Sequence, residues 1–556
     1  MNSSWKTIAR FWIVHRAAIS LVLFSALVVK VLGGVLAAID LGVADEAVYL
    51  ARGTQLGKEP LPPAESSPLY SVWYRALAVF QPDPARLYYV NWIILQGGLA
   101  LALYALARRS GASLGAALLV TTTLVLSQTP FVWPYVTCFS TLLLACTALI
   151  ATYAKDRFVA AVILSVGVTT AAFVRPELWW PSILFATACV LWAIRRATST
   201  RAFRPIAVVA PAVLAVAGQR AIFGNPVGGD RGLYAFAQHY ALNKVEDGDL
   251  PTDPWASYEA LFRPAFPHAQ RLSEALRENP AEVLWHVRRN LRLIPLHLAD
   301  VGGIHEYVPL VPRTVLMCAL VAVIVIGAVG LVRARRRPLE GLVRWLPLGL
   351  PIGIGAITSS VIVYPREHYL VPLQFFGLAA LAAGTAELAA RAPAFVRAAV
   401  PAFVALGLVL LPTYGPTVFP SLLEARRSPP PQVNKHVVET LRSLGLRRKG
   451  VLVESGWSRG LYASLDFEHV PDAAKDAPFW SFVEARHIDV LVLDRFVRDN
   501  PRFRDDPEFA AFMADASERR DFVLVPVPGE DAFVAVRRSA ARTASVSPSS
   551  HSLDRN

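Results

Sequence analysis

The sequence predicts a polytopic α-helical membrane protein with a small α/β domain in its carboxy-terminal part. Hydrophobic residues make up 54% of the chain, charged residues only 17%, and the mean hydropathy is +0.41. A soluble domain carries charge on roughly a quarter of its residues. Much of the apolar content lies in runs near the length of about 20 residues that crosses a bilayer. After the last run, short β-branched segments alternate with helical patterns, which is typical of α/β domains.

We expect about eleven membrane-spanning helices from these apolar runs. They lie near residues 17–39, 90–107, 113–131, 136–154, 158–174, 178–194, 205–222, 313–332, 343–363, 369–387 and 396–412. The first run lacks a short apolar core followed by a small-residue cleavage site, so we interpret it as a spanning helix and not as a signal peptide.

Basic residues gather in the short loops on one side of the predicted helices. Examples are Arg108 and Arg109, Lys155 and Arg157, and Arg391. By the positive-inside rule this side is the cytoplasm, and the amino terminus lies there too. The same distribution accounts for the net charge of +13, so we expect no nucleic-acid partner. Short loops on this side favour an integral protein of a bacterial inner (plasma) membrane.

The opposite, non-cytoplasmic side is predicted to receive the long loops 40–89 and 223–312. Residues 1–412 would form the transmembrane domain, 413–538 an external α/β domain in the periplasm or extracellular space, and 539–556 a disordered tail. In the second loop, amphipathic helices are expected at 253–262 and 281–293. In the α/β domain, strands are expected at 450–454, 488–493, 522–527 and 533–536. The α/β domain contains no GxGxxG or GxxxxGK[ST] motif, so no nucleotide is assigned to it.

Two adjacent carboxylates, Asp45 and Glu46, follow directly after the first apolar segment, where membrane meets water. A short helical pattern that includes Tyr49 comes next. One interpretation is a helix start, since Asp is a favoured N-cap and Glu is favoured in the first turn. The other is a general base that deprotonates a hydroxyl arriving from water, beside a leaving group held in the membrane.

Two short turns between apolar segments each carry an arginine. Arg175 precedes a proline and then Glu177, and Arg366 lies in the turn before His368. A guanidinium held at the interface suits a phosphate through paired hydrogen bonds. Alternatively, Arg175 is an interfacial anchor paired with Glu177. His368 is either a hydrogen-bond donor to the same phosphate or a structural histidine.

The sequence gives little support to a metal centre. It contains no HExxH motif and no two histidines at i, i+4 spacing. Its four cysteines lie in or beside apolar segments without CxxC spacing. We therefore predict no metal and no other cofactor, although Asp45 and Glu46 could contribute ligands to a divalent ion.

Five segments, in order along the chain, resemble motifs of the GT-C glycosyltransferases. The group concerned is the protein-mannosyltransferase-like and aminoarabinose-transferase-like branch, glycosyltransferase family 39. The segments are Ala44 to Gly53, Glu65 to Tyr70, Asp83 to Leu87, Arg175 to Glu177 and Tyr364 to Pro372. The resemblance covers roughly residues 17–390 and agrees with the predicted topology. One departure is Ser66-Ser67-Pro68, where the family usually has two prolines.

The resemblance implies inverting transfer of a sugar from a polyprenyl-phosphate donor, outside the cytoplasm. The acceptor would be a lipid, a glycan or a protein, and membrane lipid would surround the donor. Asp45 matches the family's general base and Glu46 its acidic neighbour, while Arg175 and Arg366 match phosphate contacts. Further candidate substrate contacts are Tyr49, Glu65, Arg86, Glu177 and Tyr369.

A transporter or flippase of a lipid-linked or amphipathic solute is the alternative class, and a scaffold subunit of the cell envelope is a third. A transporter usually places polar groups at the midplane on broken helices, often in two similar halves. Here the polar landmarks fall at the external ends of helices, and no internal repeat occurs. Convergence of Asp45, Arg175 and Arg366 on one external cavity would favour the enzyme.

Overall fold

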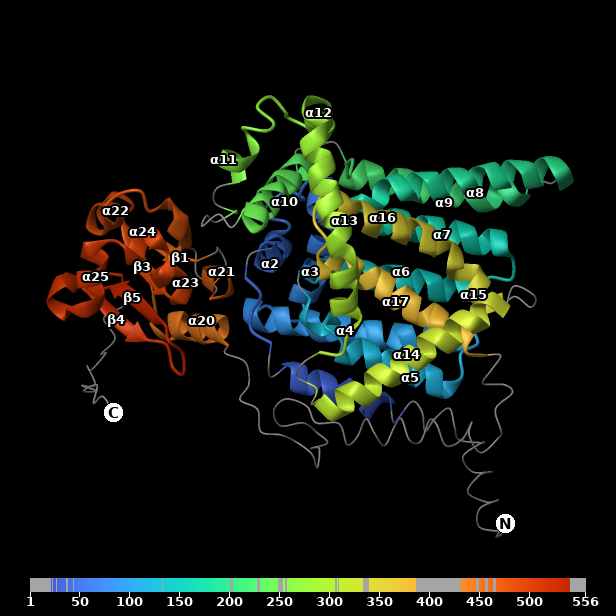
Figure 1. Cartoon of the computed structure of the whole chain (residues 1–556), viewed down its shortest axis with the longest axis horizontal. Helices are drawn as coiled ribbons and strands as arrows, with labels where there is room; N and C mark the ends of the chain where they lie inside the picture. The colour runs from blue at the N-terminus through green and yellow to red at the C-terminus, as the bar shows by residue number, and fades with distance from the viewer. Residues whose placement is uncertain are drawn as a thin grey trace, which may run out of the picture. The chain divides into compact units, whose positions relative to one another are not determined.

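Figure 1 shows the computed structural model of the chain. The structure describes residues 22, 24–26, 28–36, 39–43, 45–132, 134–200, 204–227, 231–248, 254–255, 258–305, 308, 310–333, 340–386, 432–446, 450–455, 459–463 and 467–540. The predicted span at 396–412 lies outside these residues. So do parts of the first span and most of the predicted tail at 539–556.

The chain divides into two compact units, and the predicted boundary at residue 413 lies outside the described residues. The first unit comprises Met1–Ala38, Arg52–Ala76 and Tyr89–Pro429. The second comprises Ile39–Ala51, Leu77–Tyr88 and Pro430–Asn556. Two pieces of the predicted first loop therefore belong with the carboxy-terminal residues.

Helices dominate the described part of the first unit. They are α5 (Leu114–Leu126), α6 (Val136–Tyr153), α7 (Arg157–Ala172), α8 (Trp179–Thr200), α9 (Arg204–Phe223), α10 (Arg231–Gly248), α11 (Tyr258–Phe262), α12 (Leu272–Glu278), α13 (Pro280–Gly302), α14 (Leu310–Arg333), α15 (Glu340–Trp345), α16 (Gly349–Ile362) and α17 (Glu367–Gly384). Three helices have residues in both units: α2 (Asp45–Gln55), α3 (Pro68–Ala78) and α4 (Pro84–Arg109).

Six described helical stretches are long and apolar enough to cross a bilayer, which identifies a helical membrane protein. They are Pro84–Arg109, Val136–Tyr153, Pro176–Ser199, Pro205–Phe223, Arg313–Val332 and Glu340–Ile362. Shorter apolar helices cover Phe24–Leu36, Leu114–Leu126 and Arg157–Ala172. All of these stretches coincide with apolar runs that the sequence predicts to span.

The membrane helices pack against their neighbours along the chain and also against more distant helices. Helix α7 contacts both α6 and α8, and α17 contacts both α14 and α16. Figure 1 shows α6, α7, α8 and α9 side by side, with α13 crossing the ends of the bundle. Helix α13 contacts α16 and α17, so it lies against the short turn that joins them.

Glycines permit the closest of these helix contacts. A Cβ atom at Gly330 of α14 would lie 1.8 Å from the carbonyl oxygen of Gly384 in α17. A Cβ atom at Gly327 would lie 2.5 Å from the carbonyl oxygen of Leu381. Small residues let helix backbones approach in this way within membranes, where van der Waals packing replaces the hydrophobic effect.

The loop predicted at 223–312 is more helical than expected. Helices α10 and α12 were not predicted, and α11 covers only the end of the helix expected at 253–262. Helix α13 continues well beyond the predicted end at residue 293 and has Pro295 inside it. Side chains of α10, α11, α12 and α13 share one buried aromatic core that includes Phe236, Tyr240, Phe262 and Phe266.

The second unit contains a five-stranded sheet in the order β2-β1-β3-β5-β4. Its strands are β1 (Gly450–Glu454), β2 (Phe467–Pro471), β3 (Ile488–Leu493), β4 (Phe522–Pro526) and β5 (Phe533–Arg537). Strand β1 pairs in parallel with β2 and β3, whereas β5 pairs antiparallel with β3 and β4. Four strands lie in the predicted runs, and β2 was missed.

Helices complete this unit, and apolar side chains form its core. The helices are α20 (Val433–Ser443), α21 (Arg459–Tyr462), α22 (Phe479–Ala485), α23 (Arg495–Asp499), α24 (Pro501–Arg504) and α25 (Pro507–Ala514). The core combines sheet residues such as Leu491 with aromatic residues of the helices, among them Phe479, Phe503 and Phe512.

Segments of the predicted first loop are bonded to this carboxy-terminal part. The Asp40 carboxylate accepts hydrogen bonds from the backbone N–H groups of Asn434 (2.8 Å) and Lys435 (2.9 Å). These donors lie in the first turn of α20, whose N–H groups have no partner inside the helix. Asp83 forms an ion pair with Arg442 at 3.0 Å. Asp40 therefore caps a helix that lies almost 400 residues later in the chain.

Candidate functional site

Arg175 stands at the end of α7, in the turn predicted from sequence. It has an extended backbone (φ −129°, ψ 97°), as expected for a residue before proline, and it precedes a short 3₁₀ helix, Pro176–Leu178. Its Nε and Nη2 atoms lie 2.6 Å and 2.5 Å from one Glu177 carboxylate oxygen. The Arg175 side chain is 12% exposed, so its charge is only partly solvated. The proposed pair with Glu177 is present.

Arg366 precedes the first residue of α17, in the second predicted turn. Its guanidinium carbon lies 5.0 Å from the centre of the Trp255 ring. In the same turn, the Tyr364 ring stacks on His239 of α10 with a centroid distance of 5.7 Å. Aromatic faces attract a guanidinium and hold it in a defined position. The turn is thus surrounded by rings from the loop predicted at 223–312.

The two arginines act on one group of side chains. The Arg175 guanidinium carbon lies 4.8 Å from the centre of the Tyr369 ring. His368 is buried, at 6% exposure, and interacts electrostatically with both Arg175 and Arg366. Tyr369 likewise interacts electrostatically with both arginines and with Glu177. Residues far apart in the sequence therefore form one cationic and aromatic cluster at the ends of α7 and α17.

A third arginine belongs to this cluster. Arg231, at the start of α10, acts electrostatically on Tyr369 and donates a hydrogen bond to the Glu65 carbonyl oxygen at 2.6 Å. Two residues later, the Ser67 hydroxyl donates to the Val174 carbonyl oxygen at 2.7 Å. The segment around Glu65 is therefore fixed beside Arg175. The Glu65 contact uses its backbone, and not the carboxylate on which the prediction rested.

A buried polar network holds the turn that carries Arg366. The His286 Nε2 atom lies 3.1 Å and 3.0 Å from the carbonyl oxygens of Ile362 and Val363. Carbonyls only accept, so this nitrogen carries the hydrogen, and Nδ1 accepts from the Asn243 amide at 2.8 Å. Asn290 donates to the Val361 carbonyl oxygen at 2.9 Å. The end of α16 is thereby bonded to α13 and, through Asn243, to α10.

The His239 side chain places a buried hydrogen-bond acceptor, its Nε2 atom, near Arg366. Its Nδ1 atom lies 2.7 Å from the Ala235 carbonyl oxygen, so Nδ1 carries the hydrogen and Nε2 is an acceptor. Among the described residues, Nε2 is buried and has no hydrogen-bond partner. Burial lowers the pKa of His239 to about 3, and the charge of Arg366 acts in the same direction. A neutral, buried acceptor beside an arginine suits a hydroxyl or a water molecule.

The cavity next to this cluster is small in the structure. Arg175, Glu177 and Tyr369 line it, together with Thr137 and Ser140 of α6. Its volume is about 20 Å³, which holds roughly one water molecule. An anionic head group would enter only after side chains move apart. The arrangement supplies positive charge and hydrogen-bond donors suited to a phosphate.

The other predicted site residues belong to the second unit. Asp45 is the first residue of α2 and is exposed, whereas Glu46 is fully buried at 0% exposure. Tyr49 is also buried, at 4%. Arg86 is exposed, and its backbone N–H donates to the Asp83 carboxylate at 2.8 Å, which makes Asp83 the cap of α4. Asp45 and Glu46 thus occupy the helix start predicted by the cap interpretation, and Asp45 also meets the solvent that a general base requires.

Sequence reasoning missed several residues of the cluster. His239 and Asn243 lie on α10, which was not predicted. His286 lies on α13, where the sequence pattern indicates only amphipathic packing, and Arg231 follows no recognisable motif. The available signal was weak: polar side chains such as His286 and Asn290 recur at i, i+4 on one face of a predicted helix.

No known protein family and no curated protein matches this sequence. The fold and the apolar helices define a helical membrane protein.

Proposed function

We propose that this protein is a membrane glycosyltransferase. It transfers a sugar, with inversion, from a polyprenyl-phosphate donor to a lipid, glycan or protein acceptor. The observation that carries the proposal is the meeting of Arg175, Arg366 and Tyr369 where two apolar helices end. A donor anchored by its tail in lipid presents its phosphate at that depth, and a guanidinium binds phosphate through paired hydrogen bonds.

In the proposed reaction, a hydroxyl oxygen of the acceptor attacks the anomeric carbon of the sugar. The Asp45 carboxylate accepts the hydroxyl proton, and the bond between the anomeric carbon and the phosphate oxygen breaks. The electron pair of that bond leaves with the polyprenyl phosphate, whose growing negative charge the arginines stabilise. The proposal therefore requires Asp45 to reach the sugar that Arg175 and Arg366 hold by its phosphate.

The finer topology is part of the same proposal. A GT-C-like bundle of about eleven helices places residues 40–89, 223–312 and 413–538 outside the cytoplasm of a bacterial cell. The donor and acceptor then meet on the side where no nucleotide sugar is available, which is the chemical reason for a lipid-linked donor.

The test is sugar transfer by the purified protein from a panel of polyprenyl-phosphate sugars. Asp45→Asn should keep donor binding and lower turnover by about 100- to 10,000-fold, the usual contribution of a general base. Glu59→Gln is the matched control, because it removes another exposed carboxylate of the same loop. If Asp45→Asn changes thermal stability alone, the acidic pair is only the start of a helix.

The phosphate contacts have their own measurement. Arg366→Ala should raise the donor KM by about 10- to 100-fold, since a hydrogen bond to a charged group contributes roughly 1.5–3 kcal/mol. Arg277→Ala removes an equal charge from an exposed position of the predicted 223–312 loop and should leave KM unchanged. Movement of intact donor across proteoliposomes, without any sugar transfer, would favour the transporter or flippase class instead.

A further inference from the structure

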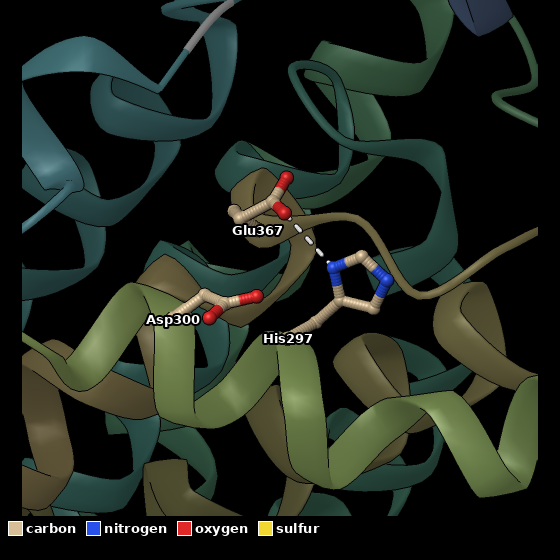
Figure 2. Close-up of side chains that lie close together, drawn as sticks. All are labelled: His297, Asp300 and Glu367. Atoms are coloured by element: carbon tan, nitrogen blue, oxygen red, sulfur yellow. Dashed lines mark hydrogen bonds and ion pairs between the residues drawn. The ribbon is translucent and has the colours of Figure 1, made fainter.

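Three potential metal ligands lie close together, as Figure 2 shows, and one of them, Glu367, follows Arg366 directly in the chain. His297 and Asp300 lie three residues apart on α13, and Glu367 is the first residue of α17. One ligand atom from each lies within 4.8 Å of the others. The His297 Nδ1 atom and a Glu367 carboxylate oxygen are 2.8 Å apart.

Two packed helices hold these ligands. Residues at i and i+3 share one face of a helix, which aligns His297 with Asp300. Helix α13 contacts α17, and the buried His286 network fixes the turn that leads to Glu367. The ligands therefore come from rigid elements that are joined independently of any ion, which is how a metal site is preorganised.

The pair of His297 and Glu367 alone does not require a metal, since the imidazole N–H donates to the carboxylate. This hydrogen bond holds the pKa of Glu367 below its usual value, so Glu367 is charged at neutral pH. The charge of Arg366 acts on Glu367 as well.

The position of Asp300 is not explained by the pair of His297 and Glu367 alone. Its carboxylate lies within reach of Glu367, yet it has no hydrogen-bond or ion-pair partner among the described residues. Two carboxylates this close repel each other unless a cation lies between them. Asp300 is exposed, which leaves a path for an ion from solvent.

We infer that His297, Asp300 and Glu367 bind one divalent transition-metal ion, with Zn²⁺ the favoured ion. One imidazole and two carboxylates match the nitrogen and oxygen ligands of Zn²⁺, whereas Mg²⁺ and Ca²⁺ prefer oxygen alone. Ligand atoms at about 2.0–2.2 Å from one ion lie at most about 4.4 Å apart. The three ligand atoms lie within 4.8 Å of one another, so they need to move by only a few tenths of an ångström at most to reach that range. Three protein ligands leave a position for water.

The ion has a consequence for Arg366, and this step rests on the proposed function. As ligands, one imidazole and two carboxylates together carry two negative charges, which a divalent cation neutralises. Glu367 then no longer offsets the charge of Arg366, and the guanidinium is freer to hold a phosphate. Metal and phosphate should therefore bind with positive coupling, and each should raise the affinity of the other.

The experiment is a Zn²⁺ titration of the purified, untagged full-length protein after treatment with a chelator, read by competition with a fluorescent Zn²⁺ indicator. We expect one Zn²⁺ per chain in the wild type, with affinity lowered at least tenfold in Asp300→Asn and in His297→Gln. Glu259→Gln, which removes another exposed carboxylate of the same loop, is the matched control and should bind like the wild type. Zn²⁺ should raise the melting temperature of the wild type and of the control alone.

Asp300→Asn is the decisive variant, because an exposed side chain can be changed without disturbing the fold. If the wild type binds no Zn²⁺, or if Asp300→Asn binds it as tightly as the wild type, the inference is overturned. These readouts do not depend on sugar transfer, so they separate the metal site from the proposed function. Affinity for inorganic phosphate, measured with and without Zn²⁺ in the wild type and in Arg366→Ala, tests the coupling.

Discussion

The guanidinium carbon of Arg175 lies 4.8 Å from the centre of the Tyr369 ring, while two of its nitrogens contact a single oxygen of Glu177. The ring and the carboxylate come from different helices, so the arginine is held from two directions. A guanidinium oriented in this way can exchange part of its pairing for a phosphate at little conformational cost.

Glu177→Gln should therefore strengthen the binding of a phosphate. Removal of the negative charge frees Arg175, and the affinity for inorganic phosphate should rise by about tenfold, equivalent to about 1.4 kcal/mol. Isothermal titration of the purified protein measures this change. An unchanged affinity together with a lower melting temperature would mean that Arg175 is only an interfacial anchor.

The buried histidine His286 should make the protein sensitive to mild acid. Burial lowers its pKa to about 4, and the charge of Arg289 acts in the same direction. In the unfolded chain the pKa is near 6.5, so the unfolded state takes up a proton first as the pH falls. The stability that neutral His286 contributes is present above about pH 6.5 and decreases toward pH 4, by on the order of 3 kcal/mol in all.

Melting temperatures at about pH 7.5 and about pH 5 test this dependence. His286→Gln should lower the melting temperature at both values and reduce the difference between them. His268→Gln, which changes an exposed histidine of the same loop, should retain the wild-type difference. Equal differences in all three proteins would contradict the prediction. His239 faces Arg366 and His286, has its pKa lowered to about 3, and contributes to the remaining difference.

Helix packing at Gly330 should not tolerate even one added methyl group. In Gly330→Ala the new Cβ atom would lie 1.8 Å from the Gly384 carbonyl oxygen, so α14 and α17 must separate. The expected loss of stability is about 1–3 kcal/mol. Gly353→Ala is the control, because its Cβ atom meets no atom within 4 Å and alanine favours the helix by up to about 1 kcal/mol. Unfolding in detergent should place the two variants on opposite sides of the wild type.

Loss of a buried ion pair should destabilise the second unit more than loss of an exposed ion pair. The Arg459 Nη2 atom lies 2.5 Å from the Asp494 carboxylate, and both side chains are 3% exposed. Arg459→Met leaves Asp494 buried and unpaired, which costs about 3–5 kcal/mol. Arg495→Met breaks an exposed pair with Asp499 and should cost less than about 1 kcal/mol. Similar melting temperatures for the two variants would contradict this assignment.

Local patterns predicted the features that depend on neighbouring residues. The turns that carry Arg175 and Arg366 follow from a proline between two apolar runs, and both turns occur at the predicted positions. The interpretation of Asp45 as a helix start rests on the preference of aspartate for that position, and α2 starts at Asp45. Helix and strand positions were predicted where the hydrophobic period was strong.

Features that depend on distant residues could not be predicted. His297 and Glu367 are 70 residues apart, and only the packing of α13 against α17 brings them together. Two of the partners of His286 are the backbone carbonyls of Ile362 and Val363, which no side-chain pattern encodes. Strand β2 was missed because it is an edge strand with mostly half-exposed residues, and its sequence, Phe-Glu-His-Val-Pro, lacks a β-branched run.

The cap that Asp40 gives to α20 has a consequence for the synthesis of the protein. The two partners are 394 residues apart, so the segment Ile39–Ala51 leaves the ribosome long before the helix that it caps. Every apolar helix between them enters the membrane first. The acidic motif Asp45-Glu46 therefore joins its compact unit only at the end of translation. A chain released early carries these carboxylates without the unit to which they belong.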